Sequence, residues 1–283
     1  MPTSTYITLV IICTLEAVLI VLGNRFTIFV FWTERSRLKR TYFLLINLAV
    51  ADLLVGITEL IIIGTAKSHN VGKGYGFLMR SRANPIPAFI LLFSGTSVYF
   101  LVLISMERAF AVLRPIRHRI TNSGLVYNCS IVITWAVGLA FFGFTLSSFH
   151  FSDFVGEYVF LTFRTFFFIS FLIICVSYLS IRTRLRAPPS SELDNHRHGS
   201  REDNLRFSKT VFIAIASSLA FWMTAFVVYS TREFCQRCFT PLVFWLVDAM
   251  YLVNSMVNPL VYSFGMQIFK DALNKSRRKR RKT

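Results

Sequence analysis

The chain has 283 residues, of which 54% are hydrophobic and only 16% are charged, whereas about a quarter of the residues in a soluble domain carry charge. Its mean hydropathy is +0.55, and the apolar residues form long blocks separated by short charged strips. This distribution excludes a soluble enzyme, a disordered chain and a small disulfide-stapled protein. It indicates an integral membrane protein.

Seven apolar blocks are long enough to cross a bilayer, which takes roughly 20 helical residues because no backbone polar group can stay unpaired in lipid. The predicted spans are 6–32, 42–65, 85–112, 124–147, 158–181, 208–229 and 242–264. The positions of three prolines agree with the predicted ends of the spans: Pro85 opens the third span, Pro115 discourages its continuation, and Pro241 precedes the seventh. Because the blocks are continuous rather than alternating, a β-barrel is disfavoured. We expect an all-α membrane protein whose residues 1–283 form one seven-transmembrane-helix bundle.

The basic residues predict the orientation of the chain in the membrane. Most of the 31 Lys and Arg residues follow the first, third and seventh spans or lie between the fifth and the sixth. Positive charge concentrates on the cytoplasmic side, so we expect the N-terminus outside the cell and the C-terminus inside. Paired prolines, paired serines and mixed charge at 182–207 predict a flexible third cytoplasmic loop.

After the seventh span, residues 265–283 are expected to form a short amphipathic helix and a basic tail. The run of Lys and Arg at 277–282 favours contact with anionic membrane lipids, at about 1 kcal/mol per basic residue. The alternative is a solvated tail with no specific partner. The net charge of +17 does not indicate a nucleic-acid partner, because the charges flank the spans on the cytoplasmic side.

Several polar side chains lie inside the predicted spans, where a charged group costs a few kcal/mol and is expected to face the bundle interior. Asp52 and Glu59 are seven residues apart and share one helix face. One carboxylate with neutral oxygens from several helices suits a small cation. The alternative is that these side chains only form hydrogen bonds between helices, which contribute about 0.6 kcal/mol per pair. Spacing alone favours this alternative. The candidates are Asn24, Asp52, Glu59, Ser97, Asp248, Asn254, Ser255 and Asn258.

Six of the predicted spans carry a short motif at a fixed place. The motifs are Gly23-Asn24 in the first span, Asn47-Leu48-Ala49-Val50-Ala51-Asp52 in the second, Glu107-Arg108-Ala109 at the end of the third, Trp135 in the fourth, Trp222 in the sixth and Asn258-Pro259-Leu260-Val261-Tyr262 in the seventh. Together they resemble those of the rhodopsin-like (class A) G protein-coupled receptors over nearly the whole chain. The resemblance implies a plasma-membrane receptor, not an enzyme, that binds an extracellular ligand and promotes nucleotide exchange on a heterotrimeric G protein.

The resemblance also implies an activation switch on the cytoplasmic side. Arg108 corresponds to the family's switch arginine, and the adjacent carboxylate of Glu107 is expected to pair with it in the inactive state. Tyr178 and Tyr262 correspond to the tyrosines that support this arginine when a G protein binds. Trp222 corresponds to a toggle side chain beneath the ligand pocket, with an interior aromatic filler as the alternative. The implied switch residues are Glu107, Arg108, Tyr178, Asn258, Pro259 and Tyr262.

Two kinds of bound group follow from the resemblance. The family holds an allosteric sodium ion at the positions that are occupied here by Asp52, Ser97, Asn254, Ser255 and Asn258. The resemblance therefore favours a cation site over hydrogen bonding that only holds the helices together. Opsins carry a retinal-binding Lys where this chain has Leu252, and amine receptors carry an Asp where it has Ile90. Retinal is therefore excluded and an ordinary biogenic amine is disfavoured. We expect a small extracellular ligand in a pocket formed by Glu59, Ile90, Arg164 and Asp248.

Some positions depart from the family pattern. The usual disulfide to the second outer loop has no cysteine partners here, but Cys235 and Cys238 face an oxidising compartment and are expected to form a small local ring rather than half of a zinc site. Ala109 replaces the usual Tyr, and Thr224 replaces a helix-bending Pro. These departures leave a non-signalling or constitutively active receptor as the alternative. A transporter is less supported, because no internal repeat or pair of broken helices is visible.

Overall fold

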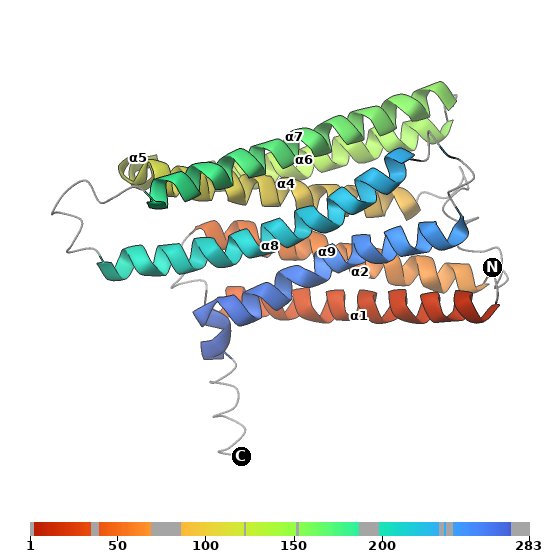
Figure 1. Cartoon of the computed structure of the whole chain (residues 1–283), viewed down its shortest axis with the longest axis horizontal. Helices are drawn as coiled ribbons and strands as arrows, with labels where there is room; N and C mark the ends of the chain where they lie inside the picture. The colour runs from red at the N-terminus through yellow and green to blue at the C-terminus, as the bar shows by residue number, and fades with distance from the viewer. Residues whose placement is uncertain are drawn as a thin grey trace, which may run out of the picture.

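The computed structural model describes residues 3–34, 40–68, 86–121, 123–150, 153–186, 198–231, 235 and 240–272. Within these ranges, seven long helices run along the long axis of the molecule (Figure 1). They are α1 (Thr3–Thr33), α2 (Thr41–Ser68), α4 (Ile86–Leu113), α6 (Gly124–His150), α7 (Asp153–Arg186), α8 (His198–Thr231) and α9 (Pro241–Gly265). The short helices are α5 (Pro115–Thr121) and 267–272. The predicted all-α seven-helix bundle is confirmed.

The outer surface of the bundle is apolar, as expected of a protein surrounded by lipid. On α1, the side chains of Leu15, Leu19 and Leu22 are each more than half exposed. By length and composition, and within the described residues, five helices can cross a membrane: Ser4–Thr33, Thr41–Thr65, Ala88–Leu113, Gly124–Ser147 and Thr165–Arg184. The apolar stretch found in α8 is shorter, Lys209–Thr224. Exposed leucines on a long helix would be unfavourable in water but are favourable in hydrocarbon.

Proline residues account for several helix ends. The helix α4 ends one residue before Arg114, and α5 begins at Pro115, because a proline cannot donate the hydrogen bond that would continue the helix. The helix α9 begins at Pro241, and the hydroxyl of its N-cap, Thr240, accepts a hydrogen bond from the backbone N–H of Val243. These helix ends agree with the sequence analysis.

The helices are longer than the predicted spans on either side of the third cytoplasmic loop. We expected a flexible segment at 182–207, but α7 continues to Arg186 and α8 already begins at His198. The residues after Ile181 form helix readily, and nothing interrupts them until Pro188, before which a helix must end. The remainder of the expected loop, 187–197, lies outside the described residues. The fifth span likewise begins earlier than expected, because α7 starts at Asp153.

The helix α4 occupies the middle of the bundle, where it packs against α2, α6 and α7, while α9 packs against α1 and α8. The main hydrophobic core is shared by these helices and includes the fully buried Phe100, Ile104 and Tyr262. The short helix 267–272 turns away from α9 (Figure 1) and anchors to this core through Phe269, whose ring centroid lies 5.3 Å from that of Phe31. Its exposed positions are polar, so it is amphipathic, as predicted; the basic tail from 273 onward lies outside the described residues.

Close packing between α1 and α2 depends on Gly56, which leads to a test of the fold. A Cβ atom on Gly56 would lie 2.9 Å from Cγ2 of Ile20 and 3.1 Å from the backbone oxygen of Ala17. We predict that Gly56→Val destabilises the purified protein by about 1–3 kcal/mol, the usual cost of overpacking, measured as a lower melting temperature in detergent. Gly64→Val, in the same helix but with open space around its Cβ position, is the control. An equal melting temperature for the two variants would contradict the observed packing.

Candidate functional site

A buried carboxylate connects three helices in the centre of the bundle. The side chain of Asp52 on α2 is fully buried. Its Oδ1 accepts hydrogen bonds from the hydroxyls of Ser97 on α4 (2.7 Å) and Ser255 on α9 (2.8 Å). Its Oδ2 accepts one from the amide of Asn258 on α9 (2.8 Å). The structure therefore brings four of the five expected cation-site residues together.

The fifth expected residue, Asn254, is buried beside this cluster on α9 but makes no hydrogen bond to Asp52 in the part of the chain that the structure describes. Its side-chain oxygen, and that of the buried Asn24 on α1, accept no hydrogen bond from the described residues. A buried acceptor without a donor costs about 1–3 kcal/mol. The carboxylate of Asp52 and the hydroxyls of Ser97 and Ser255 bring together the oxygen ligands that a small hard cation prefers.

Asn24 also explains how α9 accommodates a proline in its interior. Pro259 has no N–H and so cannot donate to the carbonyl of Ser255 one turn earlier. The amide of Asn24 donates to this carbonyl (3.1 Å), which replaces the missing helical hydrogen bond. The two helices can approach here because Gly23 has no side chain; a Cβ on Gly23 would lie 3.1 Å from Cβ of Pro259. The motifs of the first and seventh spans thus form one contact.

A second polar cluster surrounds Glu107 and Arg108 at the α5 end of α4. The guanidinium of Arg108 donates two hydrogen bonds to the carboxylate of Glu107, from Nε to Oε2 (2.5 Å) and from Nη2 to Oε1 (2.6 Å). The same Nη2 donates to the hydroxyl of Thr41 on α2 (2.6 Å), which itself donates to Glu107 Oε1 (2.9 Å). Arg108 is only 5% exposed, and the carboxylate of Glu107 forms an ion pair with it.

Glu107 also binds two residues beyond α2 and α4. The hydroxyl of Tyr127 on α6 donates to Oε1 (2.9 Å), and the Nε2 atom of His118 on α5 lies 2.9 Å from the same oxygen. The ring of His118 also packs edge-on against Phe110, with centroids 5.8 Å apart. One carboxylate therefore holds the arginine, the start of α2, the connecting helix α5 and the start of α6 in a single arrangement.

Glu107 and Arg108 were predicted from the sequence, but their partners Thr41, His118 and Tyr127 were not. Thr41 directly precedes the predicted second span, and His118 lies in the basic connection after the third, so both were expected on the cytoplasmic side of the membrane. Tyr127 is three residues into the fourth span. The spacing of residues within a helix predicts which of them share a face, because residues three or four apart lie side by side. It does not predict which residue of another helix that face contacts.

The aromatic residues expected to move on activation lie in defined contacts. Trp222 is buried between Phe167 on α7 and Tyr251 on α9, with ring centroids 4.6 and 4.1 Å away. Tyr262 is 1% exposed, in the main core. The ring of Tyr178 on α7 stacks on Phe212 of α8, with centroids 3.5 Å apart. Each of these three side chains bridges two helices, so a relative movement of those helices must displace it.

Two hydroxyls replace the helix-bending prolines that the family pattern leads us to expect. Ser170 on α7 donates to the carbonyl of Phe166 (2.8 Å), and Thr224 on α8 donates to that of Ala220 (3.0 Å). Such back-bonding competes with the helical hydrogen bond and bends helices slightly. Back-bonding therefore offers a cause of bending in α7 and α8 where these positions carry no proline.

The expected ligand-pocket residues are distributed over four helices. Glu59 on α2 is 2% exposed, and Ile90 on α4 packs against a second core cluster that includes Trp245. Arg164 and Asp248 lie in α7 and α9, but their side chains lie outside the described part of the structure.

The cysteines divide into two groups. Cys13, Cys129 and Cys175 are not in a disulfide, while Cys235 is disulfide-bonded. Its expected partner, Cys238, lies outside the described residues.

The sequence of the chain matches one family model over most of its length. The model, described as 7 transmembrane receptor (rhodopsin family), matches residues 23–262. The chain is 23% identical to the adenosine receptor A2a of Homo sapiens, over 97% of this chain and 72% of the relative. It is 27% identical to trace amine-associated receptor 5 of Pan troglodytes, over 92% of this chain and 82% of the relative. It is 24% identical to sphingosine 1-phosphate receptor 1 of Danio rerio, over 86% and 71%.

The fold is similar to that of a solved structure. Squid rhodopsin superposes with a TM-score of 0.80 at 17% identity, over 97% of this chain and 86% of the other. This agreement places the seven long helices in the arrangement of a known seven-helix membrane protein.

The network around Glu107 leads to a prediction about stability. Tyr127→Phe removes one hydrogen bond to a buried carboxylate, and a hydrogen bond to a charged group contributes about 1.5–3 kcal/mol. We expect a lower melting temperature in detergent. The control is Tyr99→Phe, whose hydroxyl makes no hydrogen bond with the described residues although its ring is packed against Phe141 and Phe166. If both variants melt alike, the hydroxyl of Tyr127 contributes nothing to the network.

Proposed function

This chain belongs to the rhodopsin family of seven-transmembrane receptors, and we propose that it binds a small extracellular ligand and promotes nucleotide exchange on a heterotrimeric G protein. Its relatives are receptors, not enzymes. They are named for adenosine, for trace amines and for sphingosine 1-phosphate, three different small molecules, which supports a small ligand. With Ile90 at the position of the amine-binding acid, an ordinary biogenic amine is the less favoured class.

The proposed orientation has α5 and the short helix 267–272 in the cytoplasm and the first residues of α1 outside the cell. Both short helices lie at the end of the bundle opposite to the N-terminus of α1 (Figure 1). The exposed Arg114 and Arg117 lie at this end, as the preference of basic residues for the cytoplasmic side requires. In this orientation, Arg108 lies at the cytoplasmic end of α4.

The observation that carries the proposal is the pairing of Arg108 with Glu107. A G protein can use the arginine only if it leaves the carboxylate, and the network of Thr41, His118 and Tyr127 around Glu107 opposes this. The chain in this arrangement corresponds to an inactive receptor. A ligand that binds better to the arrangement with the cytoplasmic ends of α7 and α8 apart would shift the equilibrium toward it. Tyr178 would then leave Phe212 and support Arg108 from α7.

The test of this function measures guanine-nucleotide exchange in membranes that contain the receptor and a panel of heterotrimeric G proteins. Glu107→Gln removes the charge that holds Arg108, and a shift of only about 1.4 kcal/mol changes an equilibrium tenfold. We expect basal exchange to rise several-fold on at least one G protein. The double variant Glu107→Gln/Arg108→Ala should return to the level of membranes without receptor.

The single variant and the unchanged protein separate the proposal from its alternatives. Exchange that stays at background in Glu107→Gln, with normal expression and melting temperature, identifies a receptor that does not signal. Exchange that is already high in the unchanged protein identifies a constitutive one, in which the pairing of Arg108 with Glu107 does not hold the inactive state.

We also propose that the Asp52 cluster holds an allosteric sodium ion. Asp52, Ser97 and Ser255 supply one charged and two neutral oxygens, and the hydroxyls can turn their lone pairs toward a cation. The unsatisfied oxygen of Asn254 lies on the same helix as Ser255, one residue before it. A bound cation would neutralise the buried carboxylate and join α2, α4 and α9. Since Asn258 belongs to both this cluster and the expected switch, sodium is expected to favour the inactive state and, by reciprocity, to bind less tightly to the active one.

Sodium binding is tested by thermal stability, because a ligand that binds only the folded state stabilises it. We expect the melting temperature to rise when sodium chloride replaces N-methyl-D-glucamine chloride at constant ionic strength. Asp52→Asn should abolish this rise. Glu59→Gln, which removes another buried acid from the same helix face, should keep it. A sodium effect that persists in Asp52→Asn would show that the ion binds elsewhere.

A further inference from the structure

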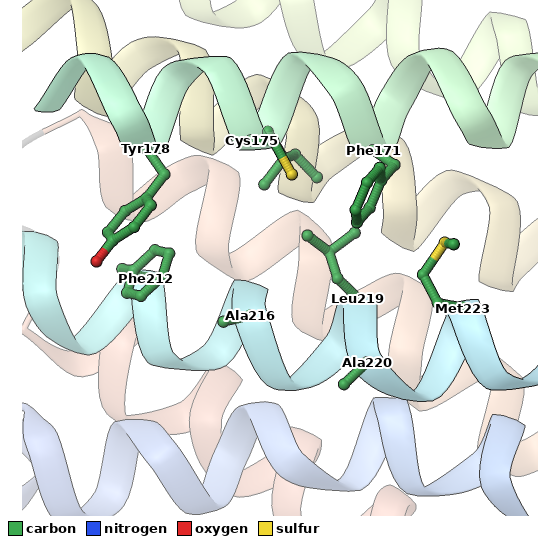
Figure 2. A pocket seen from close by; sticks show the side chains of 9 residues that line it. Phe171, Cys175, Tyr178, Phe212, Ala216, Leu219, Ala220 and Met223 are labelled. Carbon is green, nitrogen blue, oxygen red and sulfur yellow. The ribbon is translucent and has the colours of Figure 1, made fainter. Parts of the chain in front are cut away.

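An apolar groove lies between α7 and α8 (Figure 2). Its walls are formed by side chains that point toward each other from the two helices, among them Phe171 and Cys175 on α7 and Leu219 and Met223 on α8. The stacked rings of Tyr178 and Phe212 close one end. Its volume is about 290 Å³, at the lower limit of small-molecule pockets, which occupy roughly 300–1,000 Å³.

The groove opens toward the lipid rather than toward the interior of the bundle. On α7, the neighbouring side chains Leu172, Val176 and Leu179 are 45%, 62% and 55% exposed, and on α8 Ile213 is 48% exposed. These are the faces that a membrane-spanning helix turns to hydrocarbon. The groove persists because α7 packs mainly on α4 and α8 mainly on α9, so the two helices meet only sparsely.

Basic residues flank the closed end of the groove. Arg182 follows Tyr178 by one helical turn on α7, and Lys209 precedes Phe212 by one turn on α8. Residues three or four apart share a helix face, so both lie above the aromatic stack on the groove side. Both are exposed. An apolar channel that ends at two positive charges has the polarity of an anionic phospholipid.

We propose that this groove binds an anionic phospholipid of the surrounding bilayer, with one acyl chain along the apolar walls and the phosphate near Arg182 and Lys209. The inference uses the proposed orientation, in which this end of α7 and α8 meets the cytoplasmic leaflet, where anionic lipids are concentrated. The acyl chain alone would not select a lipid, because lipid tails are as apolar as the groove. The two charges provide the selection, and the groove determines where the selected lipid lies.

The test measures lipid binding to the full chain by native mass spectrometry, with phosphatidylglycerol and phosphatidylcholine of identical acyl chains as probes. We expect the unchanged protein to bind phosphatidylglycerol more tightly. Arg182→Gln and Lys209→Gln should each weaken phosphatidylglycerol binding about fivefold, which corresponds to about 1 kcal/mol per basic residue near the membrane surface. Binding of phosphatidylcholine should not change.

The groove itself is tested by filling it. Ala216→Phe, or Ala220→Phe if the first variant folds poorly, places a ring in the channel and should weaken phosphatidylglycerol binding at least as much as the loss of one charge. The matched controls are Ala140→Phe, an exposed alanine on α6, and Arg114→Gln/Arg117→Gln, two exposed arginines at the same end of the bundle. Both should bind as the unchanged protein does.

Either of two results would overturn the proposal. One is equal binding of phosphatidylglycerol by the Arg182 and Lys209 variants and the unchanged protein. The other is a filled-groove variant that binds it normally. Because the measurement contains no G protein, the outcome does not depend on whether the receptor couples to one.

Discussion

The structure depends on keeping the carboxylate of Asp52 satisfied inside a bundle surrounded by hydrocarbon. A charged group at this depth costs several kcal/mol unless polar groups surround it, and the partners it requires come from α4 and α9. Through Asn258 the cluster reaches α8, because the hydroxyl of Ser218 lies 3.5 Å from the amide oxygen of Asn258. Four helices are thus placed relative to one another by groups that cannot be left unpaired. Removing one partner leaves a buried charge short of a hydrogen bond, which makes the arrangement cooperative.

The helix α4 links this cluster to the one around Arg108. Ser97 and Arg108 are eleven residues apart, which is close to three helical turns, so both lie on one face of α4 at a separation of about 16 Å. Between them, Phe100, Leu101 and Ile104 belong to the main core together with Tyr262 of α9. A change at Asp52 that moves α9 relative to α4 must therefore repack the core residues that lie between Ser97 and Arg108. Close-packed cores respond to such changes by switching between discrete arrangements rather than by deforming continuously.

Much of this could be predicted from the sequence, because lipid simplifies the physics. Continuous apolar blocks identify the helices, and the cost of burying Asp52, Ser97 and Asn258 indicates that they face inward. Family resemblance then indicated that these residues meet. The partners of Glu107 could not be predicted in the same way: contacts of Thr41, His118 and Tyr127 with one carboxylate depend on how four separate helices are placed. The helical extensions into 182–207 were missed because polar residues signal the end of a membrane span but not the end of a helix.

The weak contact between α7 and α8 identifies the part of the bundle that can move most easily. The helices α1, α2 and α4 are joined by close glycine contacts and buried hydrogen bonds, and α9 is tied to α1 through Asn24 and Pro259. Between α7 and α8, by contrast, the contacts named above are apolar or aromatic: the stack of Tyr178 on Phe212, the packing of Phe167 against Trp222 and the walls of the groove. Apolar contacts of this kind lose little when lipid replaces them, since the acyl chain offers similar dispersion. Separation of these two helices therefore costs less than separation of any hydrogen-bonded pair, and the surrounding lipid takes part in setting that cost.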